Sequence, residues 1–396
     1  MDFQLTEDHL TTRKWAHDFA EREIRPVAPE YDETEEFPWP VVKRAAEIGL
    51  YSMEFWTEMV TPDPTGLILP LVMEEGSWGC AGISLGIFGT GLPLAALAYS
   101  ATPEQLVEWG PKMLGTPDDP KLGAFAVTEP EAGSDVSALR TTAVRDRDQW
   151  VLNGRKVFIT NGGIADVHVV VATVAPELGH RGQAAFIIGP GTRGLSQGKK
   201  ERKLGIRASH TAEVVLDDCR IPLENVAGGM EKLEAKLERA RTGQTRQHHA
   251  LKTFEMTRPS TAVQALGIAR AALEYSIDYA KQRSTFGKRI VEHQGIAFKL
   301  ADMALEVDAA RLLTWRAAWM AKNGVEFDHA EGSMSKVKAS EVAVWVTEQA
   351  VQILGGYGYI KDFPVEKWYR DAKIYTIFEG TSEIQRLVIS RALAAD

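Results

Sequence analysis

The chain has 396 residues, of which 44% are hydrophobic and 25% charged, a composition typical of a globular protein with two or three domains. Its formal net charge of −9 argues against a role in neutralising nucleic-acid phosphates. No apolar run is long enough for a membrane span, and the first ten residues lack the features of a signal peptide, so we expect a cytoplasmic protein. The two cysteines, Cys80 and Cys219, lie in no metal-ligand or redox spacing, and we expect no metal ion.

Residues 1–121 are predicted to form an N-terminal α-helical domain. Apolar residues recur at helical spacing in residues 10–24 and 39–50, and prolines separate the helical segments. Residues 83–98 are rich in Gly, Leu and Ala, a composition that suits a closely packed helix.

Residues 122–229 are predicted to form a middle antiparallel β domain. Short runs rich in β-branched residues, such as 156–160 and 167–172, are separated by turn sequences such as Asn153-Gly154. No predicted strand leads through a Gly-rich turn into a helix, which disfavours a dinucleotide-binding Rossmann unit.

Residues 230–396 are predicted to form a C-terminal α-helical bundle. Helical patterns cover residues 259–282, 294–323 and 331–354, each long enough for a bundle helix. The basic stretch 230–253 allows two interpretations, a solvated surface helix or a cationic rim for the phosphates of a ligand or for an acidic partner. The order helical, β, helical also offers a cleft between domains as a binding site.

Glu379 is the candidate catalytic residue. Ser382 and Gln385, followed by apolar residues at helical spacing, predict a capping box that opens the last helix, with Glu379 in the preceding turn. Burial beside Phe378 would raise the pKa of this carboxyl group and suit it to act as a base, although a helix N-terminus opposes that shift. Gly380 would let a ligand approach the backbone. Taken alone, the segment is equally consistent with a glutamate that caps the helix.

Four motifs together are specific where each alone is weak. In this order, residues 126–135, 283–287, 352–356 and 379–381 resemble the acyl-CoA dehydrogenase family, and the resemblance extends over essentially the whole chain. It is greatest for the short- and medium-chain branches. Other branches place the base where this chain has Thr257, which cannot serve as one.

The resemblance implies a non-covalently bound FAD and a homo-oligomer, expected to be a tetramer. The matching residues around the flavin are Phe125, Val127, Thr128, Ser134, Ile159 and Thr160. Those matching positions that hold the FAD of a neighbouring subunit are Arg283, Phe286, Gln294, Gln352, Gly355 and Gly356, with Thr381 and Glu383 near the adenine half. Those matching acyl-CoA contacts are Ser134, Glu255, Arg258 and Gly380, with Glu255 in place of the more common Asp.

The implied reaction is the α,β-dehydrogenation of an acyl-CoA thioester to the trans-2-enoyl-CoA. Glu379 takes the α-proton, the flavin accepts the β-hydride, and electrons pass to an electron-transferring flavoprotein. The same site run backwards would be a trans-2-enoyl-CoA reductase. A flavin oxidase or monooxygenase of the same fold is disfavoured by the presence of Glu379, and a non-catalytic binding protein by the intact cofactor positions. The sequence leaves the acyl chain of the substrate open.

Overall fold

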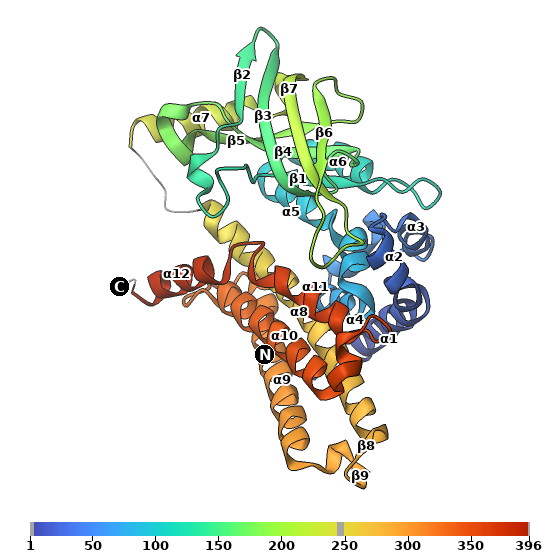
Figure 1. The fold of residues 1–396 in the computed structure, drawn as a ribbon. Helices are drawn as coiled ribbons and strands as arrows, with labels where there is room; N and C mark the ends of the chain where they lie inside the picture. The colour runs from blue at the N-terminus through green and yellow to red at the C-terminus, as the bar shows by residue number, and fades with distance from the viewer. Residues whose placement is uncertain (1–3, 244–248, 395–396) are drawn as a thin grey trace.

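The computed structural model describes residues 4–243 and 249–394, with the side chains of the longest helix described from Thr257 onward. A β-sheet occupies one end of the molecule, and a helical body extends away from it (Figure 1). The N-terminal helices are α1 (Glu7–Phe19), α2 (Ala28–Thr34), α3 (Trp39–Glu47), α4 (Ile68–Phe88), α5 (Gly91–Ser100) and α6 (Pro103–Leu114). This part is helical, as the sequence predicts.

The middle of the chain forms a seven-stranded sheet in the order β1-β4-β2-β3-β7-β6, with β5 paired to β4. Its strands are β1 (Gly123–Ala126), β2 (Thr142–Asp146), β3 (Gln149–Thr160), β4 (Val167–Thr173), β5 (Gln183–Ile188), β6 (Leu195–Lys200) and β7 (Thr211–Pro222). The expected β domain is confirmed, but its pairing is mixed and not wholly antiparallel. β1 pairs in parallel with the first part of β4, and Thr142 at the start of β2 pairs in parallel with Thr173 at the end of β4, so β1 and β2 run in the same direction along this strand.

The C-terminal part is a helical bundle, as predicted, with a small hairpin at the end remote from the large sheet (Figure 1). Its elements are α7 (Gly229–Arg241), α8 (His249–Gln282), β8 (Ser284–Thr285), β9 (Lys288–Arg289), α9 (Gln294–Lys322), α10 (Glu331–Leu354), α11 (Val365–Lys373) and α12 (Ser382–Leu393). α7 packs its buried Leu233 into the core of the large sheet, so this predicted surface helix covers the β domain. The domain boundaries at 121/122 and 229/230 remain predictions.

α4 runs into the bundle and packs closely against α8. Gly267 allows this approach, because a Cβ at that position would lie 2.3 Å from the carbonyl oxygen of Glu74. The Glu74 carboxylate is buried and meets Arg311 of α9 at 3.0 Å, and Glu75 meets Arg270 of α8. The two glutamates therefore bring α4, α8 and α9 together through charge-assisted hydrogen bonds.

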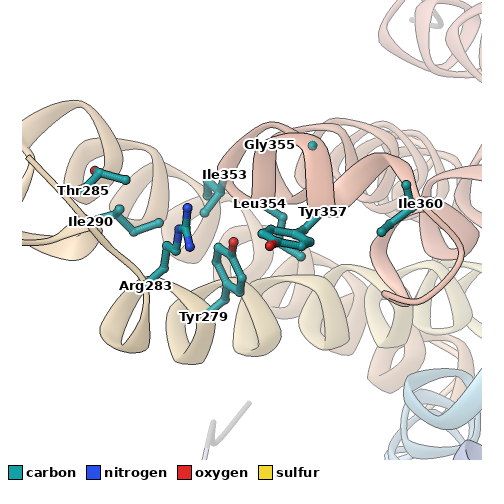
Figure 2. Close-up of a pocket in the computed structure, with 10 residues that line it drawn as sticks. Tyr279, Arg283, Thr285, Ile290, Ile353, Leu354, Gly355, Tyr357 and Ile360 are labelled. Atoms are coloured by element: carbon teal, nitrogen blue, oxygen red, sulfur yellow. The ribbon is translucent and has the colours of Figure 1, made fainter.

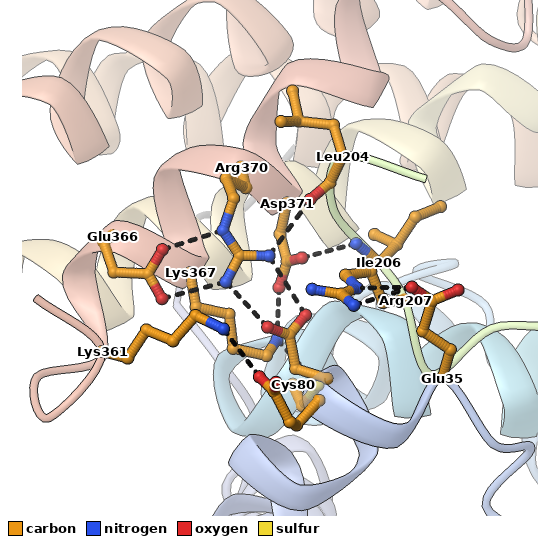
Figure 3. Close-up of polar contacts among 12 residues, drawn as sticks. Glu35, Cys80, Leu204, Ile206, Arg207, Lys361, Glu366, Lys367, Arg370 and Asp371 are labelled. Atoms are coloured by element: carbon orange, nitrogen blue, oxygen red, sulfur yellow. Dashed lines mark hydrogen bonds and ion pairs between the residues drawn. The ribbon is translucent and has the colours of Figure 1, made fainter. Parts of the chain in front are cut away.

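A second charged cluster joins the three parts of the chain (Figure 3). Asp371 on α11 accepts from Lys367 Nζ and from the backbone N–H of Ile206, each at 2.5 Å. Arg370 on the same helix pairs with Asp32 of α2 at 2.7 Å. Because Asp371 is fully buried, this interdomain cluster fixes the loop after β6 against the helical body.

Within the described residues, no single helix has the length and hydropathy needed to cross a membrane. α4 and α5, bent by 46° at their junction, pass that test only when counted together. In the same part of the chain, no three His, Cys, Asp or Glu side chains are grouped so that they could hold a metal ion.

Candidate active site

Glu379 lies in a strained turn immediately before α12. Its φ of 54° is in the left-handed region, which side-chain-bearing residues seldom adopt, and Gly380 follows with φ of 87°. Gln385 holds this turn from within α12, because its Nε2 donates to the carbonyl of Glu379 at 2.9 Å and to that of Gly380 at 3.0 Å. A Cβ at position 380 would lie 2.4 Å from that same nitrogen, so the turn requires glycine there.

The cap of α12 differs from the sequence prediction by one residue. Thr381 is the N-cap, and its Oγ1 accepts from the backbone N–H of Ile384 at 3.3 Å. Ser382, expected as the cap, is the first residue of the helix and is buried. The capping box was wrongly assigned because the Gln385 amide faces the two carbonyls of the Glu379 turn and does not return to the N-cap backbone.

The carboxyl group of Glu379 is close to two cations that the helical bundle supplies. Glu379 is half-buried, and burial raises its pKa above the usual carboxyl range, although the charges of Lys336 and Arg258 act in the opposite direction. Arg258 on α8 is 5% exposed and donates to the hydroxyl of Ser333 on α10. The raised pKa is the property expected of a group that accepts a proton near neutral pH.

Lys336 was not identified from the sequence. It is completely buried on α10, and its Nζ donates to the Gly380 carbonyl at 2.6 Å. Burial lowers its pKa to about 8, although the charge of Glu379 opposes the shift. A lysine in a run of buried small residues, with Ser333 and Ala339 on either side, was the available sequence indication.

A second buried lysine supports the loop 127–141, which carries predicted flavin contacts. Lys156 on β3 donates to the Val127 carbonyl at 2.9 Å and to the Glu129 carboxylate at 2.7 Å. Glu129 also accepts from the backbone N–H groups of Arg140 and Thr141, at 2.6 and 3.0 Å. Both ends of the loop are therefore fixed to one carboxylate, and neither Lys156 nor Glu129 was identified from the sequence.

The predicted flavin contacts lie on the β domain with different exposures. Phe125, Val127, Thr128 and Thr160 are half-buried, and Ser134 is exposed. The side chain of Ile159 is 3% exposed and packs in the core of the sheet, so the backbone is the part of this residue that a ligand can reach.

Arg283 lies at the far end of α8, beside a cavity of about 460 Å³. Figure 2 shows Arg283 and Tyr279 extending from α8 towards the end of α10, where Gly355 and Gly356 complete the lining. Arg283 is exposed, and no acidic side chain pairs with it in the described part of the chain. Because no Cβ would meet another atom within 4 Å at either glycine, their backbone is open to a ligand.

The other residues assigned to this region lie outside the cavity wall. Gln294 and Gln352 are exposed, and Phe286 is 97% exposed at the tip of the β8–β9 hairpin. Thr381 is half-buried and Glu383 exposed at the start of α12. The side chain of Glu255 lies outside the described residues, so its predicted contact with acyl-CoA has no structural counterpart here.

The Glu379 turn and the Arg283 cavity lie at different ends of α8. Arg258, whose charge acts on Glu379, and Gln282, which precedes Arg283, are separated by 24 residues of this helix, or roughly 36 Å at 1.5 Å per residue. The large sheet lies beyond the Arg258 end and the β8–β9 hairpin beyond the other (Figure 1). One chain therefore does not bring the two predicted cofactor-binding groups together.

A half-buried carboxyl group with a raised pKa and a separate cavity lined by Arg283 form an arrangement expected of a multidomain enzyme. Residues 6–116, 124–219 and 248–394 match the N-terminal, middle and C-terminal domains of acyl-CoA dehydrogenase. The chain belongs to the acyl-CoA dehydrogenase family, which confirms the resemblance; it is an oxidoreductase of a family whose cofactor is FAD.

Three proteins of similar sequence or structure illustrate this family membership. The mitochondrial short-chain specific acyl-CoA dehydrogenase of Sus scrofa is 42% identical over 389 residues, 98% of this chain and 90% of that protein. The butyryl-CoA dehydrogenase structure from Megasphaera elsdenii is 37% identical with a TM-score of 0.89, covering 100% of both chains. A chain from the structure of the electron transferring flavoprotein of Acidaminococcus fermentans is also 37% identical, with a TM-score of 0.88 and 100% coverage of both.

Proposed function

We propose that this protein is an FAD-dependent dehydrogenase of short acyl-CoA thioesters, in which Glu379 takes the α-proton. The observation that carries the proposal is the half-buried carboxyl group of Glu379, with its raised pKa, in a strained turn beside an obligatory glycine. Strain of this kind persists where the surrounding structure enforces it, which is common at active sites. The names of the pig and M. elsdenii proteins support a short acyl chain.

The residues present fit an FAD molecule shared between two chains. Arg283, without an acidic partner among the described residues, and the open backbone of Gly355 and Gly356 suit a diphosphate. On the β domain of the other chain, Thr128 and Thr160 offer hydroxyl and backbone groups for the polar edge of a flavin. When bound, FAD supplies the acceptor for the β-hydride.

Glu379 has two functions in this proposal. Its carboxylate takes the α-proton, and its backbone N–H donates to the thioester oxygen, on which negative charge develops. Gly380 leaves room for the Gln385 amide, which holds this turn in place. Burial of the carboxyl group keeps the proton acceptor away from bulk water and raises its basicity.

A homo-oligomer, with a tetramer as the expected state, follows from the same arrangement. The separation of roughly 36 Å along α8 supports the proposal that the Arg283 cavity serves the cofactor of a neighbouring chain. The 97% exposed ring of Phe286 is the type of surface that a partner covers. Arg283→Ala should weaken FAD retention by roughly 10-fold or more in dialysis, since a charge-assisted hydrogen bond is lost. A fully active, FAD-loaded monomer by light scattering would contradict the oligomer.

The electron acceptor is proposed to be an electron-transferring flavoprotein, by analogy with the A. fermentans structure. A cytoplasmic location and physiological flux towards the enoyl-CoA complete the proposal. The same residues would catalyse the reverse reduction, because a catalyst lowers the barrier equally in both directions. The electron donor or acceptor available to the flavin sets the direction of flux, and reoxidation of the substrate-reduced enzyme by an electron-transferring flavoprotein tests the proposed direction.

The decisive test is Glu379→Gln, which keeps the shape of the side chain and removes its basicity. Flavin reduction by butyryl-CoA, followed anaerobically by rapid mixing, should slow by roughly 10²–10⁴, the range for a positioned general base. Binding of FAD and acyl-CoA should persist, because the backbone N–H is retained. Bleaching of the flavin at the wild-type rate would move the base elsewhere.

A further inference from the structure

One face of α10 packs against the turn that carries Glu379 and donates a hydrogen bond to it. Ser333 and Lys336 are one helical turn apart on this face, and both are fully buried. Ser333 accepts from Arg258 of α8, while Lys336 donates to the Gly380 carbonyl at 2.6 Å. α10 therefore contributes one cation, Lys336, to the Glu379 turn and holds a second, Arg258 of α8, through Ser333.

The Lys336 contact is made to the turn and not to a carboxylate. Lys336 forms no ion pair with an acidic side chain in the described part of the chain, although burying an ammonium group without such a partner is costly. Its hydrogen bond instead fixes the peptide between Gly380 and Thr381, directly after the two residues with positive φ, 54° at Glu379 and 87° at Gly380. A structural role alone would be served equally well by an apolar side chain of the same volume.

We infer that Lys336 is a positioning residue for Glu379, which holds the left-handed turn through the Gly380 carbonyl and places a buried positive charge beside it. The inference rests on the proposed role of Glu379 as the base. Two effects follow, one geometric and one electrostatic. The geometric effect directs the carboxylate at the substrate, and the electrostatic effect limits how far burial suppresses ionisation.

Charged groups from each neighbouring element act on this contact. Arg258 of α8 repels the ammonium group of Lys336, while Glu341 of α10, Glu379 of the turn and Glu383 of α12 attract it. Lys336 and Arg258 in turn lower the pKa of Glu379 against the larger effect of burial. Removing the charge at position 336 should therefore raise the pKa of Glu379 by about one unit, the lower end of the range for an adjacent opposite charge.

Three substitutions separate the two effects. Lys336→Met removes both the hydrogen bond and the charge, Lys336→Gln keeps a donor without charge, and Lys336→Arg keeps both. Lys338→Met is the matched control. Lys338 lies two residues after Lys336 on α10, but it points to the surface and pairs there with Glu306 of α9. Rates of flavin reduction by butyryl-CoA are measured for each FAD-loaded variant between pH 5 and 10.

In Lys336→Met, flavin reduction should be roughly 10- to 100-fold slower, as expected for a misdirected base. The acid limb of its pH–rate profile should move to higher pH by about one unit. Lys336→Gln should show the same pH shift with a smaller loss of rate, and Lys336→Arg should restore the wild-type acid limb. Lys338→Met should match the wild type. If Lys336→Met does not fold, the Lys336→Gln and Lys336→Arg profiles decide the question.

A measurement without turnover makes the inference independent of the assigned reaction. The carboxyl stretching band of protonated Glu379, identified by its loss in Glu379→Gln, is titrated by infrared difference spectroscopy in the resting FAD-loaded enzyme. The midpoint should rise by about one pH unit in Lys336→Gln. An unchanged midpoint and acid limb in that variant would overturn the role of Lys336. Wild-type flavin reduction by Glu379→Gln would overturn the proposed base instead.

Discussion

Two buried lysines of the C-terminal bundle have opposite surroundings. Lys367 on α11 meets the Asp371 carboxylate at 2.5 Å, and this pairing raises its pKa despite the cost of burial. Lys336 on α10 meets a backbone carbonyl, and burial lowers its pKa to about 8. Both side chains are buried, so burial alone does not explain why their pKa values shift in opposite directions. The difference arises because Lys367 has a carboxylate partner and Lys336 a neutral carbonyl.

The comparison separates a cluster of paired charges from the proposed catalytic site. Around Lys367, the cations have carboxylate partners that join α2, the loop after β6 and α11 (Figure 3). Lys336 donates to a backbone carbonyl and Arg258 to a hydroxyl, while the carboxyl group of Glu379 has a raised pKa. A carboxyl group with a raised pKa close to a lysine with a lowered pKa is characteristic of sites that exchange protons.

The largest expected effect comes from breaking the Lys367 pair. Asp371→Asn leaves the ammonium group of Lys367 buried without a counter-charge, and we expect a loss of about 3–5 kcal/mol in the free energy of unfolding. The measurement is urea denaturation of the FAD-loaded protein, followed by circular dichroism.

The control for this prediction is the exposed neighbour of the same cluster. Lys361 pairs with Glu33 at 2.7 Å, but both side chains are about two thirds exposed. Lys361→Met should change the free energy of unfolding by less than about 1 kcal/mol. Equal effects of the two substitutions would mean that Asp371 does not compensate a buried charge.

The next largest effect is the change with pH in the free energy of unfolding, which distinguishes Lys336 from Lys367. The pKa of Lys336 is about 8 in the folded protein and near 10.5 without the fold, so the unfolded chain binds more protons between these values. The free energy of unfolding should therefore rise with pH in this window, by roughly 2 kcal/mol in total, and Lys336→Met should lack that rise.

Lys367 should contribute no such rise, because its pKa is raised in the folded protein and the ion pair stays intact up to pH 10. The difference between wild type and Lys336→Met, measured by urea denaturation at pH 7.5 and 10, isolates the contribution of Lys336. A difference independent of pH would show that Lys336 titrates as it does in the unfolded chain.

The order of the domains and the position of Glu379 could be predicted from the sequence because both depend on local patterns. Apolar spacing predicts bundle helices, of which α10 is found at residues 331–354 as expected. Phe378, Gly380 and the helix after them place Glu379 in a turn. The left-handed φ at Glu379 has no local indication, since it is imposed by Gln385 and Lys336 from two different helices.

The groups that support the site were missed for the same physical reason. Lys156 and Glu129 are 27 residues apart, and their pairing depends on how the sheet folds the loop 127–141 back onto β3. Lys336 and Gly380 are 44 residues apart on different elements. The parallel pairing of β1 with β4 likewise joins strands separated along the chain by β2 and β3, which strand patterns do not reveal.

The smallest effect we predict is that of Ser333→Ala, which tests the hydroxyl partner of Arg258. The substitution removes one acceptor from a buried guanidinium group while leaving Lys336 in place, so the free energy of unfolding should fall by about 1 kcal/mol. Ser340→Ala is the control, because Ser340 is also buried on α10 but its hydroxyl donates to a carbonyl of its own helix at 2.7 Å. That change should be within about 0.5 kcal/mol of neutral, since alanine favours the helix. Equal effects of the two substitutions in urea denaturation would mean that the Ser333 hydroxyl does not compensate the charge of Arg258, and that Lys336 alone gives α10 its influence on the Glu379 turn.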